Sequence, residues 1–399
     1  MADIFKGAPM MLAASQARDS NGGFVDRHGE MPNEHDGARL SIEIGQTTNP
    51  DGSITVLLAR KLSSAWCRES HHDRLSALPL AQRAWILQET LMARRIAHFM
   101  DTELLWECVT SLKCECMQVD CSDTSESCKS HGLVRQFDFT NTPHRELPTS
   151  VYEQWRNLRS TYSERAITRE TDRLPALSGL AKLYMARLYK SADDTGRYLA
   201  GFWKEDLLQS IIWRIQPGHY QRASPYRAPT WSPFSLEYVD TPRGVPFEFE
   251  FEHRYWKLGR TYATVVGGEC VPAGKDPTGA VKQDSYILLS GVLARSSCRW
   301  AEGASWSNDS GRSILFGDNH IAVDWDVDPD LEQPRTLYSL LIGETAFGWG
   351  KVLPIALVLQ RSEVDEAYER VGLLGLYSYG GKELMNIFDG AHETLVKII

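Results

Sequence analysis

The stretch PLAQRAWILQETLMARRIAHFMDTELLWECV, residues 79–109, decides the fold of the N-terminal part of the chain. Pro79 stands near the start of a predicted helix, where a proline is tolerated. Apolar side chains recur there at helical spacing and predict one buried stripe: Leu80, Ala84, Leu87 and Leu91. RIAHF and ELLWECV follow, separated by Met-Asp-Thr, and they predict a strand hairpin.

The flanking sequence extends this pattern in both directions. ARLSIEIG and DGSITVLLAR predict a second hairpin over residues 38–60, and residues 1–20 predict a short helix or strand end. Residues 110–148 are rich in Ser, Asp, Thr and Cys, which is typical of an exposed insertion. Further helices are expected over residues 150–160, 174–190 and 198–213.

The pattern changes to short strands and turns from about residue 225. We therefore predict an α+β protein of two domains. Residues 1–220 form an α/β and helical region, and residues 221–399 form a β-rich, barrel-like C-terminal domain.

Composition limits the classes of partner and compartment. The chain has 399 residues and a formal net charge of -9, which argues against nucleic acid because phosphate binding needs a basic surface. No apolar run approaches the roughly 20 residues of a membrane span, and the N-terminus lacks the basic segment of a signal peptide. We expect a cytoplasmic protein with reduced cysteines.

The sequence offers no familiar cofactor or metal motif. It contains no phosphate-binding glycine loop, no Rossmann fingerprint and no nucleophile elbow. The closely spaced cysteines do not have the paired spacing of a structural zinc site: Cys108, Cys114, Cys116, Cys121 and Cys128. We expect neither a metal nor a cofactor.

Four stretches together resemble fungal heterokaryon-incompatibility (HET) domain proteins. The first is LAQRAWILQETLMARRIAHF with LLWEC, which resembles the Arg-Ala-Trp-x-x-Gln-Glu helix of the family. The others are YSERAITRETDRLPALSGLA (162–181), YLAGFWKEDLLQSIIWR (198–214) and YRAPTWSPFS (226–235). The opening FKGAPMMLAASQARDSNGGF and the late YERVGLLGL are similar to the family as well, so the resemblance covers nearly the whole chain.

The resemblance implies a shortened member of this family. HET proteins carry an earlier segment, likened to nucleotide-processing TIR-type folds, that has no counterpart here. The chain also has Trp-Ser-Pro-Phe, with Pro233 and Phe234, where the family usually has Trp-Ser-Trp. The expected fold is therefore a truncated HET-type α/β remnant with helices, followed by the β-rich domain.

Polar residues within the resembling stretches are candidates for chemistry. Gln88, Arg83 and Tyr162 are candidate hydrogen-bond donors. Glu89 and His98 are candidate acid–base residues, since burial beside tryptophan rings can raise the pKa of a carboxyl group. The alternative for Gln88 and Glu89 is a structural hydrogen-bond network that ties the helix to a loop, and the alternative for His98 is a satisfied structural histidine.

The chain is rich in tryptophan, with 12 in all. Tryptophan suits both protein cores and apolar ligand pockets. Five aromatic residues are candidate walls of a substrate pocket: Trp85, Trp106, Trp203, Trp231 and Phe234. Core packing is the alternative for each of them.

Two functions follow from these observations. In the first, the chain is a cofactor-independent enzyme of fungal secondary metabolism that folds an apolar terpenoid or polyketide for intramolecular cyclisation or a Diels–Alder cycloaddition, because orientation alone removes much of such a barrier. In the second, it is a non-enzymatic heterokaryon-incompatibility or self/non-self regulator that acts through protein partners or as a homo-oligomer.

Overall fold

The structure, a computed structural model, describes most of the chain as two compact units, Met1–Asp138 and Phe139–Ile399. The boundary predicted at residue 220 falls inside the second unit. The described residues are 2–24, 41–60, 75, 77–100, 104–108, 111–114, 148–189, 195–215, 219–239, 247–248, 258–300, 313–316, 319–327, 335–347, 351–363, 366–375 and 381–399.

The whole is an α+β protein, as the sequence predicts. No helix among the described residues is long and apolar enough to cross a membrane. Most of the predicted insertion at 110–148 lies outside the described residues.

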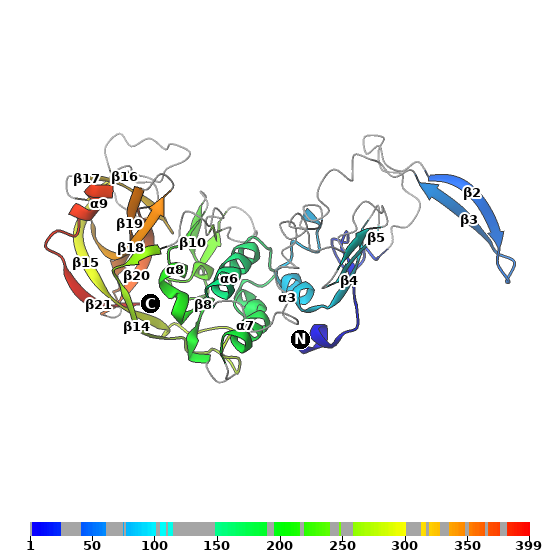
Figure 1. The fold of residues 1–399 in the computed structure, drawn as a ribbon, viewed down its shortest axis with the longest axis horizontal. Coiled ribbons are helices and arrows are strands. Elements are labelled where there is room, and N and C mark those ends of the chain that lie inside the picture. Colours follow the sequence, from blue (N-terminus) through cyan, green and yellow to red (C-terminus); the bar gives the residue numbers. More distant parts are fainter. Residues whose placement is uncertain are drawn as a thin grey trace. The chain divides into compact units, whose positions relative to one another are not determined.

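The first unit contains a four-stranded sheet in the order β1-β4-β5-β6, of which Figure 1 labels β4 and β5. Strand β1 is parallel to β4, and the other pairs are antiparallel. The predicted hairpins at 38–60 and 95–109 are both present. The elements are α1 (Ala2–Gly7), β1 (Met11–Ala14), β2 (Ser41–Thr48), β3 (Ile54–Arg60), α3 (Ala84–Met92), β4 (Arg95–Phe99), β5 (Leu104–Cys108) and β6 (Leu112–Cys114).

Helix α3 is shorter than the sequence predicts, because it begins at Ala84 and not beside Pro79. The preceding residues form separate turns, and Arg83 has an extended backbone with φ of -90° and ψ of 133°. An extended residue cannot continue helical hydrogen bonding, so the helix begins only after it. The predicted stripe is confirmed within the helix by the burial of Ala84, Leu87 and Leu91.

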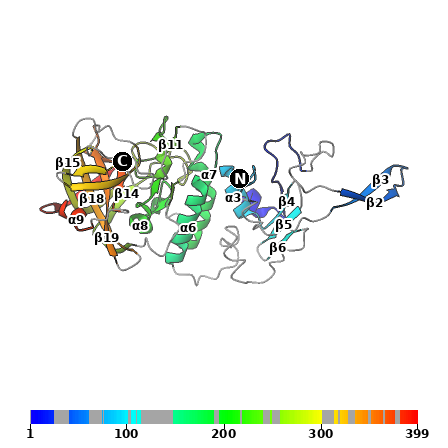
Figure 2. The ribbon, with the colours of Figure 1, turned by 90° about the horizontal axis from the view of Figure 1, so that it is seen from above.

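The second unit opens with the two predicted helices, α6 (Pro148–Ser163) and α7 (Pro175–Leu188). They lie side by side (Figures 1 and 2). Proline at the first helical position of α7 removes only a backbone N–H that has no partner within a helix. The short 3₁₀ helix η1 (Glu170–Asp172) precedes α7.

The helix predicted over residues 198–213 is wrong. The structure has the strands β7 (Tyr198–Leu199) and β8 (Phe202–Trp203), the 3₁₀ helix η3 (Lys204–Asp206) and one turn of helix, α8 (Leu207–Ser210). Ala200 and Gly201 have positive φ values of 44° and 101°, as a two-residue hairpin turn requires. The local Ala-Gly turn therefore overrides the helical spacing of the apolar residues.

Short elements connect this region to a large sheet. They are η2 (Thr195–Arg197), β9 (Arg214–Ile215), β10 (Tyr220–Arg222), η4 (Pro233–Ser235), β11 (Leu236–Tyr238) and β12 (Phe247–Glu248). The large sheet contains β13 (Leu258–Thr261), β14 (Thr264–Glu269), β15 (Tyr286–Trp300), β16 (Ser313–Phe316), β17 (Asn319–Trp325), β18 (Arg335–Phe347), β19 (Lys351–Arg361), β20 (Tyr368–Leu374) and β21 (His392–Ile398).

The strand pairings of the large sheet close on themselves. They run from β18 through β19, β20, β17, β16 and β15, and β15 pairs again with β18. The enclosed side chains form an apolar core that includes Leu337, Val358 and Leu374. Leu384 of helix α9 (Gly381–Asn386) and Phe388 join the same core. The interior of this strand ring is therefore filled by side chains.

A buried ion pair in the large sheet also makes hydrogen bonds to the segment after α8. Arg370 of β20 and Asp326 after β17 have exposed fractions of 0% and 1%. Arg370 donates to both carboxylate oxygens of Asp326, at 2.9 and 3.1 Å, and to the carbonyl oxygens of Ile211 and Trp213. Its guanidinium carbon lies 3.5 Å from the ring centre of Trp213. Arg370 thus holds two parts of the second unit in register.

Candidate functional site

Three polar side chains meet in the sheet of the first unit. Ser15 directly follows β1, His98 lies near the end of β4, and Glu107 lies in β5. Because β1 and β4 are parallel, Ser15 and the end of β4 come to the same edge of the sheet. The antiparallel pairing of β4 with β5 brings Glu107 beside the same strand.

These three residues form a continuous hydrogen-bonded chain. Ser15 Oγ lies 3.1 Å from His98 Nδ1, and His98 Nε2 lies 3.1 Å from Glu107 Oε2. The exposed fractions are 3% for Ser15 and 7% for both His98 and Glu107. We refer to them below as the Ser15–His98–Glu107 relay.

The relay contacts favour one tautomer of a neutral His98 imidazole. A carboxylate only accepts hydrogen bonds, so Glu107 accepts from the Nε2–H of His98. Nδ1 of a neutral His98 is then an acceptor for the Ser15 hydroxyl, which also lies 3.4 Å from a second acceptor, the carbonyl oxygen of Ala13. A hydroxyl, an imidazole and a carboxylate in this order can move a proton away from the hydroxyl oxygen, as in nucleophilic and acid–base catalysis.

Sequence reasoning found His98 but missed Ser15 and Glu107. A signal for Glu107 was present, because it alternates with Leu105 in LLWEC and so shares the buried face of β5. Ser15 gave no such signal, since its approach to His98 depends on the parallel pairing of β1 with β4, across 83 residues of chain.

The candidates on α3 occupy different environments. Gln88 is buried, whereas Arg83 is exposed. Glu89 is half-buried, so its pKa is raised by burial, and the charge of Arg83 opposes this rise. Within the described part of the first unit, no hydrogen bond or ion pair joins Glu89 to His98.

Two of the five candidate wall residues, Trp85 and Trp106, belong to the first unit and are half-buried. Trp106 is the neighbour of Glu107 in β5 and pairs in register with Ala97 of β4. Both rings therefore combine a buried part with an accessible part, and the alternation of side chains along β5 puts the Trp106 ring on the face opposite Glu107.

The remaining aromatic candidates lie in the second unit and form part of its core. Tyr162, Trp203 and Trp231 each have an exposed fraction of 0%, and Phe234 is also buried. The ring centres of Tyr162 and Phe234 are 5.8 Å apart. Trp203 packs against Trp155, and Trp231 against Phe202. The structure brings Tyr162 and Phe234 together, and core packing accounts for these four rings.

Tyr162 has its hydroxyl group already engaged. It donates a 2.6 Å hydrogen bond to the carbonyl oxygen of Arg173, at the start of α7. Burial raises the pKa of Tyr162 well above its ordinary value. Its observed contact ties α6 to the segment before α7, and its role as a donor to a substrate stays a prediction.

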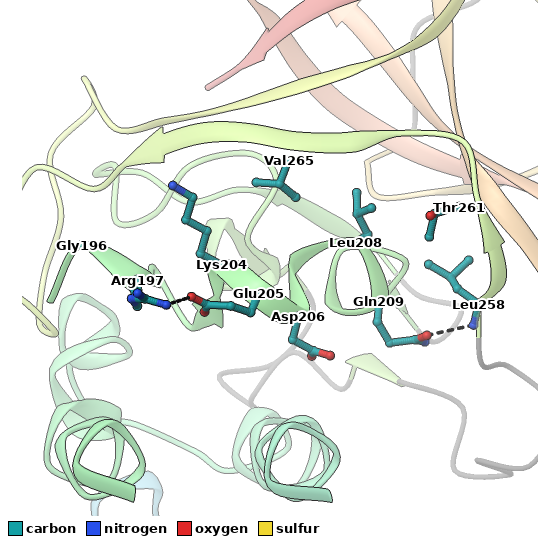
Figure 3. Close-up of a pocket in the computed structure, with 10 residues that line it drawn as sticks. All are labelled: Gly196, Arg197, Lys204, Glu205, Asp206, Leu208, Gln209, Leu258, Thr261 and Val265. Carbon is teal, nitrogen blue, oxygen red and sulfur yellow. Dashed lines mark hydrogen bonds and ion pairs between the residues drawn. The ribbon is translucent and has the colours of Figure 1, made fainter. Parts of the chain in front are cut away.

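A separate pocket of about 790 Å³ lies in the second unit (Figure 3). Its walls come from η2, η3, α8, β13 and the start of β14, and none of the sequence-predicted site residues lines it. The lining residues are Gly196, Arg197, Lys204, Glu205, Asp206, Leu208, Gln209, Leu258, Thr261 and Val265.

Among the described residues, no group of three or more His, Cys, Asp and Glu side chains could hold a metal ion. Of the cysteine cluster, Cys108 and Cys114 are described and are not joined to each other in a disulfide, and Cys116, Cys121 and Cys128 lie outside the described residues. No known protein family, curated protein or solved structure matches this chain.

Proposed function

We propose that the chain is a cofactor-independent enzyme built on a HET-derived scaffold, with His98 as its acid–base residue. The observation that supports this proposal is the Ser15–His98–Glu107 relay. Glu107 holds the ring orientation and tautomer of His98, so that Nδ1 of His98 can take a proton from the Ser15 hydroxyl.

The substrate class that we propose is an apolar terpenoid or polyketide that undergoes intramolecular cyclisation, including Diels–Alder closure. Such a reaction needs a folded substrate, exclusion of water and a few hydrogen bonds. Trp85 and Trp106 are proposed as apolar walls, because both rings are only half-buried and lie in the unit that contains the relay. Gln88 and Arg83 are proposed donors, and Glu89, whose pKa is raised by burial, is a second proposed acid.

A specific observation favours the second candidate function, a regulator that binds protein partners. Strands β2 and β3 form a two-stranded sheet of their own. Ile54 and Val56, two residues apart on β3, have exposed fractions of 63% and 44%. An isolated two-stranded hairpin is marginally stable in water, and an exposed apolar strand can pair with another chain.

Mass spectrometry of the protein purified from its host tests the two functions against each other. The enzyme proposal expects a small apolar metabolite that is bound under native conditions and lost on denaturation. An empty protein that carries one specific protein partner would contradict the enzyme proposal and favour the regulator.

Turnover of the captured metabolite then tests the relay. His98→Gln and Glu107→Gln are expected to lower the rate, with a loss of about 10²- to 10⁴-fold for His98→Gln. His392→Gln is the matched control, because His392 is an exposed histidine at the start of β21 in the other unit. Unchanged turnover by a folded His98→Gln variant would remove His98 from the mechanism.

A further inference from the structure

The pocket of the second unit has one charged side and one apolar side. Its apolar residues are Leu208 of α8, Leu258 of β13 and Val265 of β14. Figure 3 shows Lys204 and Leu208 extending toward β14, and Val265 pointing from that strand back toward them. A ligand that fills this space therefore contacts aliphatic side chains along its body and a cation at one end.

The two carboxylates of the pocket are already neutralised. Asp206 accepts hydrogen bonds from Arg156 at 2.5 and 2.6 Å and from the Ser210 hydroxyl at 2.6 Å. Both of its oxygens are thus engaged by groups beside the pocket.

Glu205 is engaged in the same way. It pairs with Arg197 through one oxygen and accepts a 2.6 Å hydrogen bond from the Tyr189 hydroxyl through the other. Arg197 is held further by Tyr189, because its guanidinium carbon lies 4.8 Å from the centre of that ring.

Lys204 is the cation of the pocket that these pairs leave uncompensated. Within the described residues, no carboxylate lies in ion-pair distance of its ammonium group. It is half-buried on η3, between the exposed rim and the buried Trp203. Partial burial strengthens the attraction between an ammonium and an anion, because water screens it less there than at a fully exposed site.

We propose that this pocket binds an amphipathic monocarboxylate, with the carboxylate on Lys204 and the apolar chain against Leu208, Leu258 and Val265. A volume of about 790 Å³ lies within the range of small-molecule sites, roughly 300–1,000 Å³. One uncompensated positive charge matches one negative charge on the ligand. The site lies in the second unit and is independent of the relay, so it is a binding function beyond the enzyme proposed above.

A carboxylate fits this pocket better than a phosphate does. Phosphate sites in proteins combine several donors, typically an arginine fork or a row of backbone N–H groups. Here Arg197 and the nearby Arg156 are each committed to a carboxylate of the protein. A single lysine remains, and a single ammonium suits a monoanion.

Isothermal titration calorimetry on the full chain tests the proposal with three probes that share a ten-carbon chain: decanoate, decanol and decyl phosphate. Decanoate is expected to bind at least tenfold more tightly than decanol, because a hydrogen bond to a charged group contributes about one decade or more in affinity. Equal affinity for decanol, or tighter binding of decyl phosphate, would overturn the carboxylate assignment.

Two variants locate the binding. Lys204→Met is expected to weaken decanoate binding about tenfold and to leave decanol unaffected. Val265→Glu places a negative charge on the apolar side and is expected to abolish decanoate binding. Lys275→Met is the matched control, since Lys275 is an exposed lysine of the same unit outside the pocket.

A photoreactive diazirine analogue of decanoate gives a second readout that does not depend on affinity. Labelled peptides are expected to contain Leu208 or Val265, and an excess of decanoate is expected to suppress this labelling. Labelling confined to peptides elsewhere, or an unchanged affinity in a folded Lys204→Met variant, would refute the site.

Discussion

Replacement of Arg370 by methionine should strongly destabilise the second unit. The change removes both hydrogen bonds from Arg370 to the buried Asp326 carboxylate and leaves it, among the described residues, only Arg222, at 4.0 Å, and breaking a buried pair from one side costs about 3–5 kcal/mol. It also leaves the carbonyl oxygens of Ile211 and Trp213 without the Arg370 donor, at about 1–3 kcal/mol each. Since these contributions overlap, we expect a loss of about 5 kcal/mol.

The double variant Arg370→Met with Asp326→Leu separates the ion pair from packing. Removing both charges eliminates the buried carboxylate that Arg370→Met leaves without hydrogen bonds from Arg370, so the double variant is expected to regain at least about 2 kcal/mol relative to Arg370→Met alone. Arg361→Met is the control, because Arg361 is an exposed arginine of β19 and its loss should cost under about 0.5 kcal/mol.

Native-state hydrogen exchange of the β20 peptides, read by mass spectrometry, measures these losses in the full chain. It reports on the second unit separately from the first. A loss below about 1 kcal/mol for Arg370→Met would refute the reasoning, and so would a double variant no more stable than the single one.

Two further predictions concern the second unit. Gly201→Ala is expected to cost about 2–4 kcal/mol in urea unfolding, because φ at Gly201 is 101° and a Cβ atom would lie 2.8 Å from the Phe234 ring. Gly274→Ala, where a Cβ atom meets nothing within 4 Å, should stay within about 0.5 kcal/mol, and equal losses would contradict this account. Burial raises the pKa of Asp324 to about 6 from an ordinary 3.8. Between these two values the folded state binds more protons than the unfolded state does. The free energy of unfolding therefore falls as the pH rises from about 4 through 6. Asp324→Asn should remove up to about 3 kcal/mol of this pH dependence. The measurement is the free energy of unfolding from urea titrations between about pH 4 and 6. An equally large fall in the variant and the wild type would contradict the assignment to Asp324.

Periodicity predicted the elements whose signals are local and repeated. The helices α6 and α7 and the hairpins β2–β3 and β4–β5 follow from apolar spacing alone. The periodicity of apolar residues gave the wrong element at residues 198–213, where it favoured a helix. The positive φ values of Ala200 and Gly201 form a hairpin turn there instead. The late start of α3 has a similar origin, since the extended backbone of Arg83 outweighs the helical pattern before it.

The candidate site was only partly predictable. His98 could be singled out as a histidine in an apolar strand, and Glu107 could have been found from its alternation with Leu105. The approach of Ser15 depends on strand pairing over a long separation, which no local pattern reports. For Trp203 and Trp231, composition could not distinguish a pocket wall from a core residue; both rings are fully buried, and their role as pocket walls stays a prediction.

The closed strand ring has a consequence for synthesis on the ribosome. Strand β15 completes its pairing late in translation, because two of its partners, β18 and β21, are made well after it, and the hydrogen bond between Ser290 and Glu393 spans 103 residues. Until β18 emerges, the apolar residues of β15 have no partner strand on that side. A nascent chain in this interval should therefore bind chaperones strongly. Slow codons placed just before residue 335, where β18 begins, should lower the yield of folded protein. Slow codons placed in a C-terminal tag, after the whole chain has been made, should lower it less.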